Sequence, residues 1–276
     1  MKKVFWLFIV GVNLSFAQTS NPSSESTIWQ SFKYDAGNIV RGIGHAYSRP
    51  FQWKGDQWKT FGMVTAANGF VYLFDEQTSD FFRDQKKDIP QDLLNYGWYY
   101  GNPQNNYMLT TGVYLTGLFT KNTKLRRTGV LMISSATAAG VLQQFSKFAF
   151  GRARPKSGRS KNTFDPWSSD KNFHSFPSGH AVMAFTNAYA IAKQFKNPWV
   201  KAGIYTVGLI PPATRLWEGA HWLSDITFGV VIAIFTVEAI DKYLDARYDE
   251  KYNAQSKKMR WDLQFAPGQL GVVVRF

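Results

Sequence analysis

The chain has 276 residues, a formal net charge of +13 at pH 7 and no cysteine. Without cysteine, it forms no disulfide and offers no thiolate as a nucleophile or a metal ligand. The positive charge suits anionic lipid headgroups or phosphorylated substrates. Because the lysines and arginines are spread along the chain instead of gathering on one basic helix, we expect no nucleic-acid partner.

The first 17 residues have the pattern of a secretory signal peptide. Two lysines precede an apolar run over residues 4–12, and Ser15-Phe16-Ala17 follows it. We expect cleavage after Ala17 and export to the bacterial cell envelope. The alternative is a first membrane-spanning helix, although the run is short for a span. Residues 18–59 are expected to form an N-terminal leader and irregular region, because their first part is rich in Ser and Asn.

Six uncharged, mostly apolar stretches follow along the chain. They span residues 60–74, 107–120, 128–145, 181–192, 202–214 and 226–237. Stretches of this length without sustained alternation favour buried helices over strands. Segments that contain Gly, Pro and Asn separate them and predict turns. We therefore predict an all-α fold, a helical bundle of about six helices in one domain over residues 60–246.

The last four stretches predict a four-helix core. Consecutive helices joined by such turns run alternately up and down. The end of the first helix, the start of the second, the end of the third and the start of the fourth then lie on one side of the core. Connectivity alone therefore predicts a single active-site pocket at one end of the four-helix core.

Three short motifs stand at these helix ends. They are Lys147 with Arg154-Pro155, then Pro177-Ser178-Gly179-His180, then Arg215 with His221 and Asp225. Together they supply three cations, two imidazoles, one carboxylate and a Ser-Gly turn. This set can hold a tetrahedral oxyanion and attack it, which indicates phosphoryl transfer.

The spacing within the motifs supports this interpretation. Lys147 and Arg154 are seven residues apart, so on one helix they share a face, and Pro155 is expected to end that helix. His221 and Asp225 are four residues apart, so on a helix the carboxylate can orient the imidazole. Each residue taken singly has an ordinary explanation, such as a solvated charge at a helix end, a Ser cap or a surface histidine. The complete set favours a functional site.

The pattern resembles the type 2 phosphatidic acid phosphatase and vanadium haloperoxidase superfamily. The signature of that superfamily is K-x6-R-P, then P-S-G-H, then S-R-x5-H-x3-D, and the three motifs match it. The one departure is Thr214, where the superfamily usually has Ser, and the hydroxyl is retained. The resemblance covers residues 107–243 and favours the phosphatase branch.

The resemblance implies a role for each matched residue. His221 is expected to be the nucleophile through Nε2, giving a phosphohistidine, with its Nδ1–H held toward Asp225. His180 is expected to protonate the leaving oxygen and then to activate water. The expected phosphate-binding groups are Lys147, Arg154, Ser178, Gly179 and Arg215. The scheme uses no metal and no cofactor.

Other hydrolase designs fit the sequence poorly, because it contains no H-E-x-x-H motif, no Walker-type glycine loop and no G-x-S-x-G elbow. Two alternatives stay open. One is a vanadate-dependent haloperoxidase with the same pocket, and the other is a non-catalytic protein that binds an anion or a lipid. The expected substrate is a phosphorylated lipid or a small phosphomonoester. The motifs leave that choice and the oligomeric state open.

The sequence leaves membrane insertion open as well. The mean hydropathy is −0.27, and several apolar stretches are short for a bilayer core. We expect a membrane-associated protein with its pocket on the periplasmic side, and a soluble periplasmic protein is the alternative.

Two segments outside the motifs also carry expectations. The connection over residues 156–176 is expected to border the pocket, either as a lid over the substrate or as an ordinary loop with packing aromatics. The tail over residues 247–276 is expected to contain a short β-hairpin, with strands over 261–265 and 271–275 around Pro267-Gly268.

Overall fold

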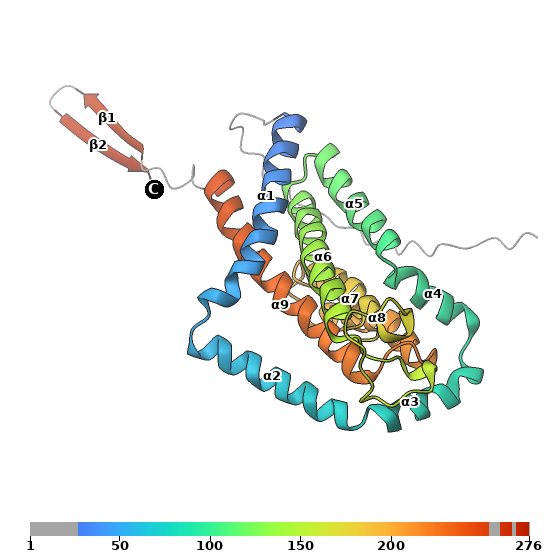
Figure 1. Ribbon diagram of the computed structural model, residues 1–276. Helices are drawn as coiled ribbons and strands as arrows, with labels where there is room; N and C mark the ends of the chain where they lie inside the picture. Colours follow the sequence, from blue (N-terminus) through green and yellow to red (C-terminus); the bar gives the residue numbers. More distant parts are fainter. Residues whose placement is uncertain (1–26, 254–259, 267–268, 276) are drawn as a thin grey trace, which may run out of the picture.

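The computed structural model describes residues 27–253, 260–266 and 269–275, and the first of these segments is mostly helical (Figure 1). The predicted helical class is therefore confirmed. Within residues 27–253 there are nine α-helices instead of about six. They are α1 (Ile28–Ser48), α2 (Gly55–Leu73), α3 (Asp75–Asp84), α4 (Gln91–Gly101), α5 (Pro103–Phe119), α6 (Thr123–Phe150), α7 (Gly179–Ala192), α8 (Pro198–Trp217) and α9 (Leu223–Tyr248). Short turns are η1 (Arg49–Gln52), η2 (Gln85–Asp88), η3 (Pro155–Ser157), η4 (Lys171–Phe173) and the π-helical η5 (Asp249–Asn253).

Each of the six apolar stretches forms a helix, to within one residue at its end, and α1, α3 and α4 are additional. The expectation that all six helices are buried is wrong for residues 60–74, because α2 has no buried residue. The irregular region expected over residues 18–59 contains α1 instead, which is a correction. Thr27 begins α1 through a reciprocal capping box with Gln30, and Ile39 and Ile43 pack on the core. Polar and charged residues interrupt the apolar ones along α1, so an uninterrupted apolar run does not mark this helix. The predicted signal peptide lies outside the described residues.

The core lies where α6, α7 and α9 pack together. Their completely buried apolar side chains include Val130, Leu131, Val182, Val237 and Ile240. Burial stabilises the fold by about 1.5–3 kcal/mol for each large apolar side chain. Gly229 of α9 permits a close approach to α7, because a Cβ there would lie 2.9 Å from both Ala181 Cβ and Ser178 O. The starts of α7 and α9, which both carry motif residues, therefore lie side by side.

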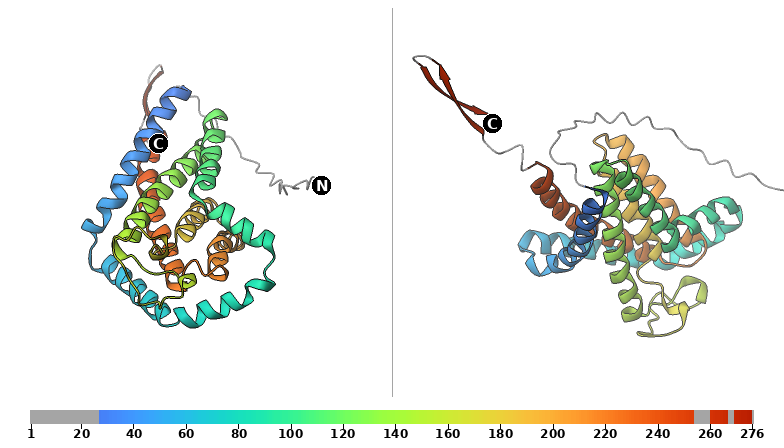
Figure 2. Two further views of the ribbon diagram at one scale, coloured as in Figure 1. Left: turned by 45° about the vertical axis from the view of Figure 1, so that its right-hand side comes forward. Right: turned by 90° about the horizontal axis from the view of Figure 1, so that it is seen from above.

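The helix ends that carry the motifs meet at one end of the bundle. Gln143 Nε2 in α6 donates a hydrogen bond to Pro177 O just before α7 (3.1 Å). The Ser178 N–H before α7 donates to Asp225 O at the start of α9 (3.0 Å). The main chain after α6 also bonds to the main chain after α8. Helices α2 and α3 run across this end of the bundle (Figures 1 and 2).

One helical segment among the described residues, Leu223–Tyr252, is long and apolar enough to cross a membrane. Half of its most apolar window is buried inside the protein. A core helix shares this length and composition, so the measure alone does not separate the two kinds of helix.

Two strands lie near the C-terminus of the chain. β1 (Arg260–Ala266) and β2 (Gln269–Arg275) pair antiparallel, with Arg260 opposite Arg275. The helices of residues 27–253 define the fold class. The C-terminal hairpin that the sequence analysis expects stays a prediction.

Candidate active site

Helix α6 ends before Gly151, which places Lys147 and Arg154 differently from the prediction. Gly151 has a left-handed conformation with φ of 56°, and its N–H donates to Lys147 O, a common glycine ending of a helix. A Cβ at this position would lie 1.8 Å from Asp165 O, so the close approach requires glycine. Lys147 lies in the last turn of α6, and Arg154 lies in an extended segment beyond it. The prediction that the two share one helix face, with Pro155 ending the helix, is wrong.

Three main-chain carbonyls hold the Arg154 side chain. Its Nε donates to Lys171 O (3.0 Å), its Nη1 to Ala220 O (2.8 Å) and its Nη2 to His174 O (2.9 Å). These bonds use three of the five guanidinium donors, and two remain for an anion. Because the side chain is already fixed, binding an anion immobilises little further side-chain freedom.

Arg215 supplies a second cation from the last turn of α8. Its side chain is buried, and its Nη1 pairs with Glu218 Oε2 (2.7 Å). The guanidinium also lies over the ring of Trp98, 5.4 Å from the ring centre. The Thr214 hydroxyl lies 3.3 Å from Arg215 Nε. The hydroxyl that the signature requires before this arginine is therefore in place.

Lys147 supplies the third cation. Burial and the positive charge of Arg154 lower the pKa of Lys147 to about 8, although Asp225 opposes the shift. A lysine with this pKa is mostly charged at neutral pH and loses its proton in weak alkali. An anion bound beside it would stabilise the charged form.

Helix α7 begins within the second motif. Ser178 caps the helix, and its Oγ accepts from the Ala181 N–H (3.4 Å). Gly179 is the first helical residue, so its N–H and that of His180 have no acceptor within the helix. N–H groups at a helix start, together with the helix dipole, favour a bound anion. The capping role and the anion-binding role of this motif therefore use the same geometry.

His180 packs between α7 and α4. Its ring centre is 5.5 Å from that of Trp98, and a Cβ at Gly101 would lie 2.1 Å from His180 Cδ2. Within the described residues, the buried Nε2 of His180 has no hydrogen-bond partner. Burial lowers the pKa of His180 to about 2, and the further contributions come from the positive forms of Arg215, His221, Lys147 and Arg154. These five side chains therefore share one electrostatic neighbourhood, as they must if one anion contacts them all.

The main chain of the connection over residues 156–176 holds His221. Its Nδ1 lies 2.7 Å from Ser175 O, and a carbonyl oxygen can only accept, so Nδ1 carries the proton. Burial lowers the pKa of His221 to about 3, with Asp225 opposing the shift. The ring is therefore neutral at pH 7, and its Nε2 has a free lone pair.

Asp225 does not make the predicted hydrogen bond to His221. Its Oδ2 lies 3.8 Å from Nδ1 and instead accepts from Ser175 Oγ (2.5 Å) and the Trp222 N–H (2.9 Å). Its Oδ1 accepts from Arg152 Nη1 (2.6 Å). Burial acts to raise the pKa of Asp225, but the surrounding charges and hydrogen bonds keep it below the usual value. Asp225 thus acts on His221 indirectly, through its hydrogen bond with Ser175 and through the electrostatic effect of its charge. Its part in catalysis stays a prediction.

The sequence analysis missed three residues of this site. Ser175 holds His221 through its carbonyl, which any residue type could supply, so the sequence gives no signal for it. Arg152 is 1% exposed, and a cation between the apolar Phe150 and Ala153 was a signal for a buried partner. Trp98 belongs to α4, upstream of every motif. Only the three-dimensional structure brings it against His180 and Arg215.

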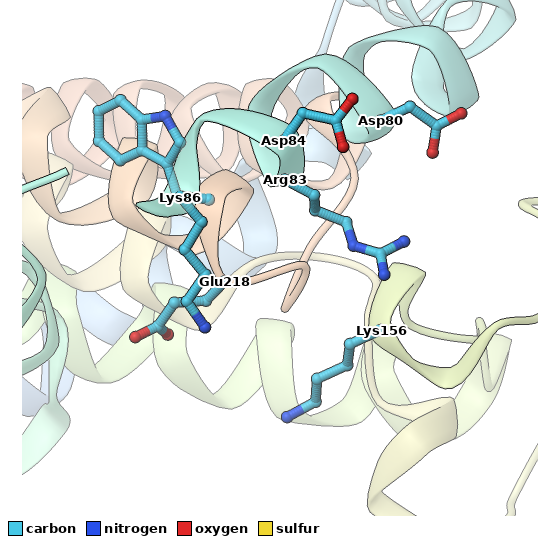
Figure 3. A pocket seen from close by; sticks show the side chains of 7 residues that line it. Asp80, Arg83, Asp84, Lys86, Lys156 and Glu218 are labelled. Atoms are coloured by element: carbon cyan, nitrogen blue, oxygen red, sulfur yellow. The ribbon is translucent and has the colours of Figure 1, made fainter. Parts of the chain in front are cut away.

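A cavity of about 520 Å³ lies between α3 and the end of α8. Its lining residues come from α3, η2, η3 and the end of α8 (Figure 3): Asp80, Arg83, Asp84, Lys86, Lys156, Trp217 and Glu218. Glu218 pairs with Arg215, so the cavity adjoins the side chain of one of the three candidate phosphate-binding cations. Among the described residues, no group of three or more His, Asp or Glu side chains is arranged to hold a metal ion.

The helical body carries the candidate anion-binding residues at its helix ends. Residues 128–248 match the family model described as the PAP2 superfamily, and this match supports the superfamily that the three motifs resemble. No solved structure matches the chain.

Two relatives described as lipid A 1-phosphatase are similar to part of the chain. The one from Porphyromonas gingivalis is 29% identical over 115 residues, which are 40% of this chain and 23% of the relative. The one from Rhizobium etli is 33% identical over 107 residues, which are 37% of this chain and 44% of the relative. The chain thus spans less than half the length of these relatives.

Proposed function

We propose that the protein is a phosphatase that hydrolyses a phosphate monoester or pyrophosphate of a membrane lipid. The observation that carries the proposal is the bond from His221 Nδ1 to Ser175 O, which leaves the Nε2 lone pair free in the neighbourhood of Lys147 and Arg154. The two lipid A 1-phosphatases support a lipid substrate. The match to the PAP2 superfamily model supports a phosphoric ester hydrolase.

The reaction is proposed to begin with attack of His221 Nε2 on phosphorus. The N–P bond forms as the bond from phosphorus to the leaving oxygen breaks, and His180 gives that oxygen a proton. Charge that spreads over the equatorial oxygens is stabilised by N–H groups at the start of α7 and by the cations of Lys147, Arg154 and Arg215. Water then attacks the phosphohistidine, and His180 takes a proton from it. Phosphate leaves, and His221 is neutral again.

The low pKa of His180 is compatible with both of its proposed roles. Burial and neighbouring positive charge lower the pKa to about 2, so the free ring is neutral and can accept a proton from water. A phosphate dianion bound among the same cations offsets their charge and raises the pKa. The substrate is thus proposed to promote protonation of the group that serves as its general acid.

The activity is expected to fall in weak alkali because Lys147 loses its charge. Its pKa is lowered to about 8. The phosphate clamp, which we define as the cations of Lys147, Arg154 and Arg215, therefore has all three charges below this pH and loses that of Lys147 as the pH rises through it. We expect kcat/KM for a soluble aryl phosphate to decline above pH 8, and Lys147→Arg to remove this limb, because a guanidinium stays charged. Lys59→Arg on the exposed part of α2 should keep the parental profile. If kcat/KM of Lys147→Arg still declined above pH 8, the decline would have to come from another titrating group.

A membrane location is proposed from the outer surface of the protein. Helix α2 has no buried residue, and its exposed side chains include Met63, Phe70 and Leu73. Residues 60–74 carry no charge. An exposed apolar surface of this kind suits a lipid bilayer. With the predicted signal peptide, it supports a place in the bacterial cell envelope with the pocket facing the periplasm.

Release of inorganic phosphate from a panel of substrates tests the proposed function. The panel comprises phosphatidic acid, an isoprenyl pyrophosphate, lipid A 1-phosphate and a soluble phosphomonoester, with the lipids in vesicles and EDTA in excess. We expect the protein to sediment with the vesicles and to release phosphate from at least one lipid despite EDTA. Bromination with vanadate and peroxide, without phosphate release, would instead support a haloperoxidase. Binding without either reaction would support a non-catalytic protein.

A further inference from the structure

Asp75 is the first residue of α3 and lies well before the segment that matches the superfamily. Its side chain is completely buried. Oδ1 accepts from the Ser224 N–H (2.9 Å), and Oδ2 accepts from Ser224 Oγ (2.5 Å) and from Arg152 Nη2 (2.8 Å). A buried carboxylate needs such partners to remain charged. Asp75 therefore joins α3 to the start of α9 and to the segment after α6.

Arg152 connects Asp75 to the candidate active site. Its Nη2 donates a hydrogen bond to Asp75 Oδ2, and its Nη1 donates to Asp225 Oδ1 (2.6 Å) and to Ser224 Oγ (2.8 Å). The guanidinium also lies 4.5 Å from the ring centre of Tyr72. One buried cation is thus shared between two buried carboxylates, with one oxygen of each in contact with it.

Ser175 connects Arg152 and Asp225 to the nucleophile. Its N–H donates to Arg152 O (3.0 Å), and its hydroxyl donates to Asp225 Oδ2 (2.5 Å). Its carbonyl accepts from His221 Nδ1 (2.7 Å). Ser175, whose carbonyl orients the imidazole, is therefore held through its N–H by the Arg152 main chain and through its hydroxyl by the Asp225 carboxylate.

We propose that Asp75 is a positioning residue for His221, an inference that rests on the proposed phosphatase function. A guanidinium can bind both oxygens of one carboxylate at once. Because Asp75 occupies Nη2, Arg152 engages only Oδ1 of Asp225. Oδ2 then stays with Ser175 and the Trp222 N–H. Without Asp75, the Arg152 fork turns toward both oxygens of Asp225, and the Ser175 carbonyl loses its fixed position.

The variant Asp75→Asn tests this role with almost no change in size. An amide has one oxygen and one NH2 group. In either orientation the NH2 meets a donor, because the Ser224 N–H faces one oxygen and Arg152 Nη2 faces the other. The variant thus releases Arg152 while Lys147, Arg154 and Arg215 keep their places. Asp56→Asn is the matched control, since Asp56 is an exposed residue of the neighbouring helix α2 and lies outside the cavity lining.

The readout is the ratio of the inhibition constants of vanadate and inorganic phosphate. Vanadate bonds to His221 Nε2 in a geometry that resembles the transition state, whereas phosphate needs only the cations. Since a misplacement of about 1 Å can cost roughly a hundredfold in rate, we expect Asp75→Asn to lower kcat at least about tenfold and to raise the vanadate constant by a similar factor. KM and the phosphate constant should change less than about threefold. Asp56→Asn should match the parent.

Three results would overturn the inference while the parent is active. They are an Asp75→Asn variant with parental kcat, an equal loss of vanadate and phosphate binding, and the same effect in Asp56→Asn. If Asp75→Asn does not fold, as judged by thermal unfolding, Ser224→Ala decides, because it removes the hydroxyl shared by Asp75 and Arg152. It should raise the vanadate-to-phosphate ratio, and a parental ratio would contradict the inference. Failure of the proposed function is distinct, because it would appear as a parent that releases no phosphate.

Discussion

His221→Ala is expected to abolish turnover of a phosphomonoester. Loss of the nucleophile in a covalent mechanism lowers kcat by roughly 10⁴–10⁶-fold. The physical reason is that His221 has the three properties that the nucleophile needs: a neutral ring, a proton fixed on Nδ1 by Ser175 O and a free Nε2. Initial rates with a soluble phosphomonoester, at saturating concentration, provide the measurement.

His45→Ala is the matched control for this loss. His45 lies on α1 against the ring of Tyr243, so its removal should leave kcat unchanged. His180→Ala should slow the reaction most for poor leaving groups, which depend on protonation. Turnover by His221→Ala at the parental rate would end the covalent mechanism, whatever the effect of His180→Ala.

Arg154→Ala is expected to produce the second large effect. The side chain is fixed by three carbonyls before substrate binds, and its two remaining donors are proposed to contact the phosphoryl oxygens. Removing such a donor from a charged transition state costs roughly 2–4 kcal/mol in kcat/KM. The loss should be visible in kcat/KM for the same soluble phosphomonoester.

Arg154→Lys separates charge from geometry at this position. Lysine carries the same charge, but it cannot replace the three bonds to the carbonyls or the planar fork, so we expect only partial recovery. Arg159→Ala, which removes an exposed arginine five residues further along the chain, should change kcat/KM by less than about threefold, as surface charges do. Full activity of Arg154→Ala would remove this residue from the clamp.

The parts of the fold that the sequence predicted are those with a local signal. Apolar stretches such as 128–145 and 181–192 form helices of the core because they are apolar and longer than an ordinary strand. Alternation of helix direction then brings Lys147, His180 and Arg215 to one end of the bundle. The four-residue spacing within the third motif placed Asp225 Oδ2 3.8 Å from His221 Nδ1, whereas the seven-residue spacing within the first did not place Lys147 and Arg154 on one helix.

The rest of the site depends on contacts that no local pattern records. The left-handed Gly151 moves Arg154 off α6 and onto three carbonyls from distant positions. The carbonyl that orients His221 has no residue-type signature. Trp98 and Asp75 reach the site through helices whose sequences mix polar and apolar residues, so their positions follow from tertiary packing alone.

Rapid quenching of the enzyme with a 32P-labelled phosphomonoester tests the central claim most directly. We predict a labelled protein whose phosphate is stable in base and labile in acid, with the label on His221 and absent from His221→Ala. The rate constant for loss of the label should be no smaller than kcat, because water releases the phosphate in the second step of every turnover. Turnover without any labelled protein, or a label on His180 instead of His221, would contradict the account.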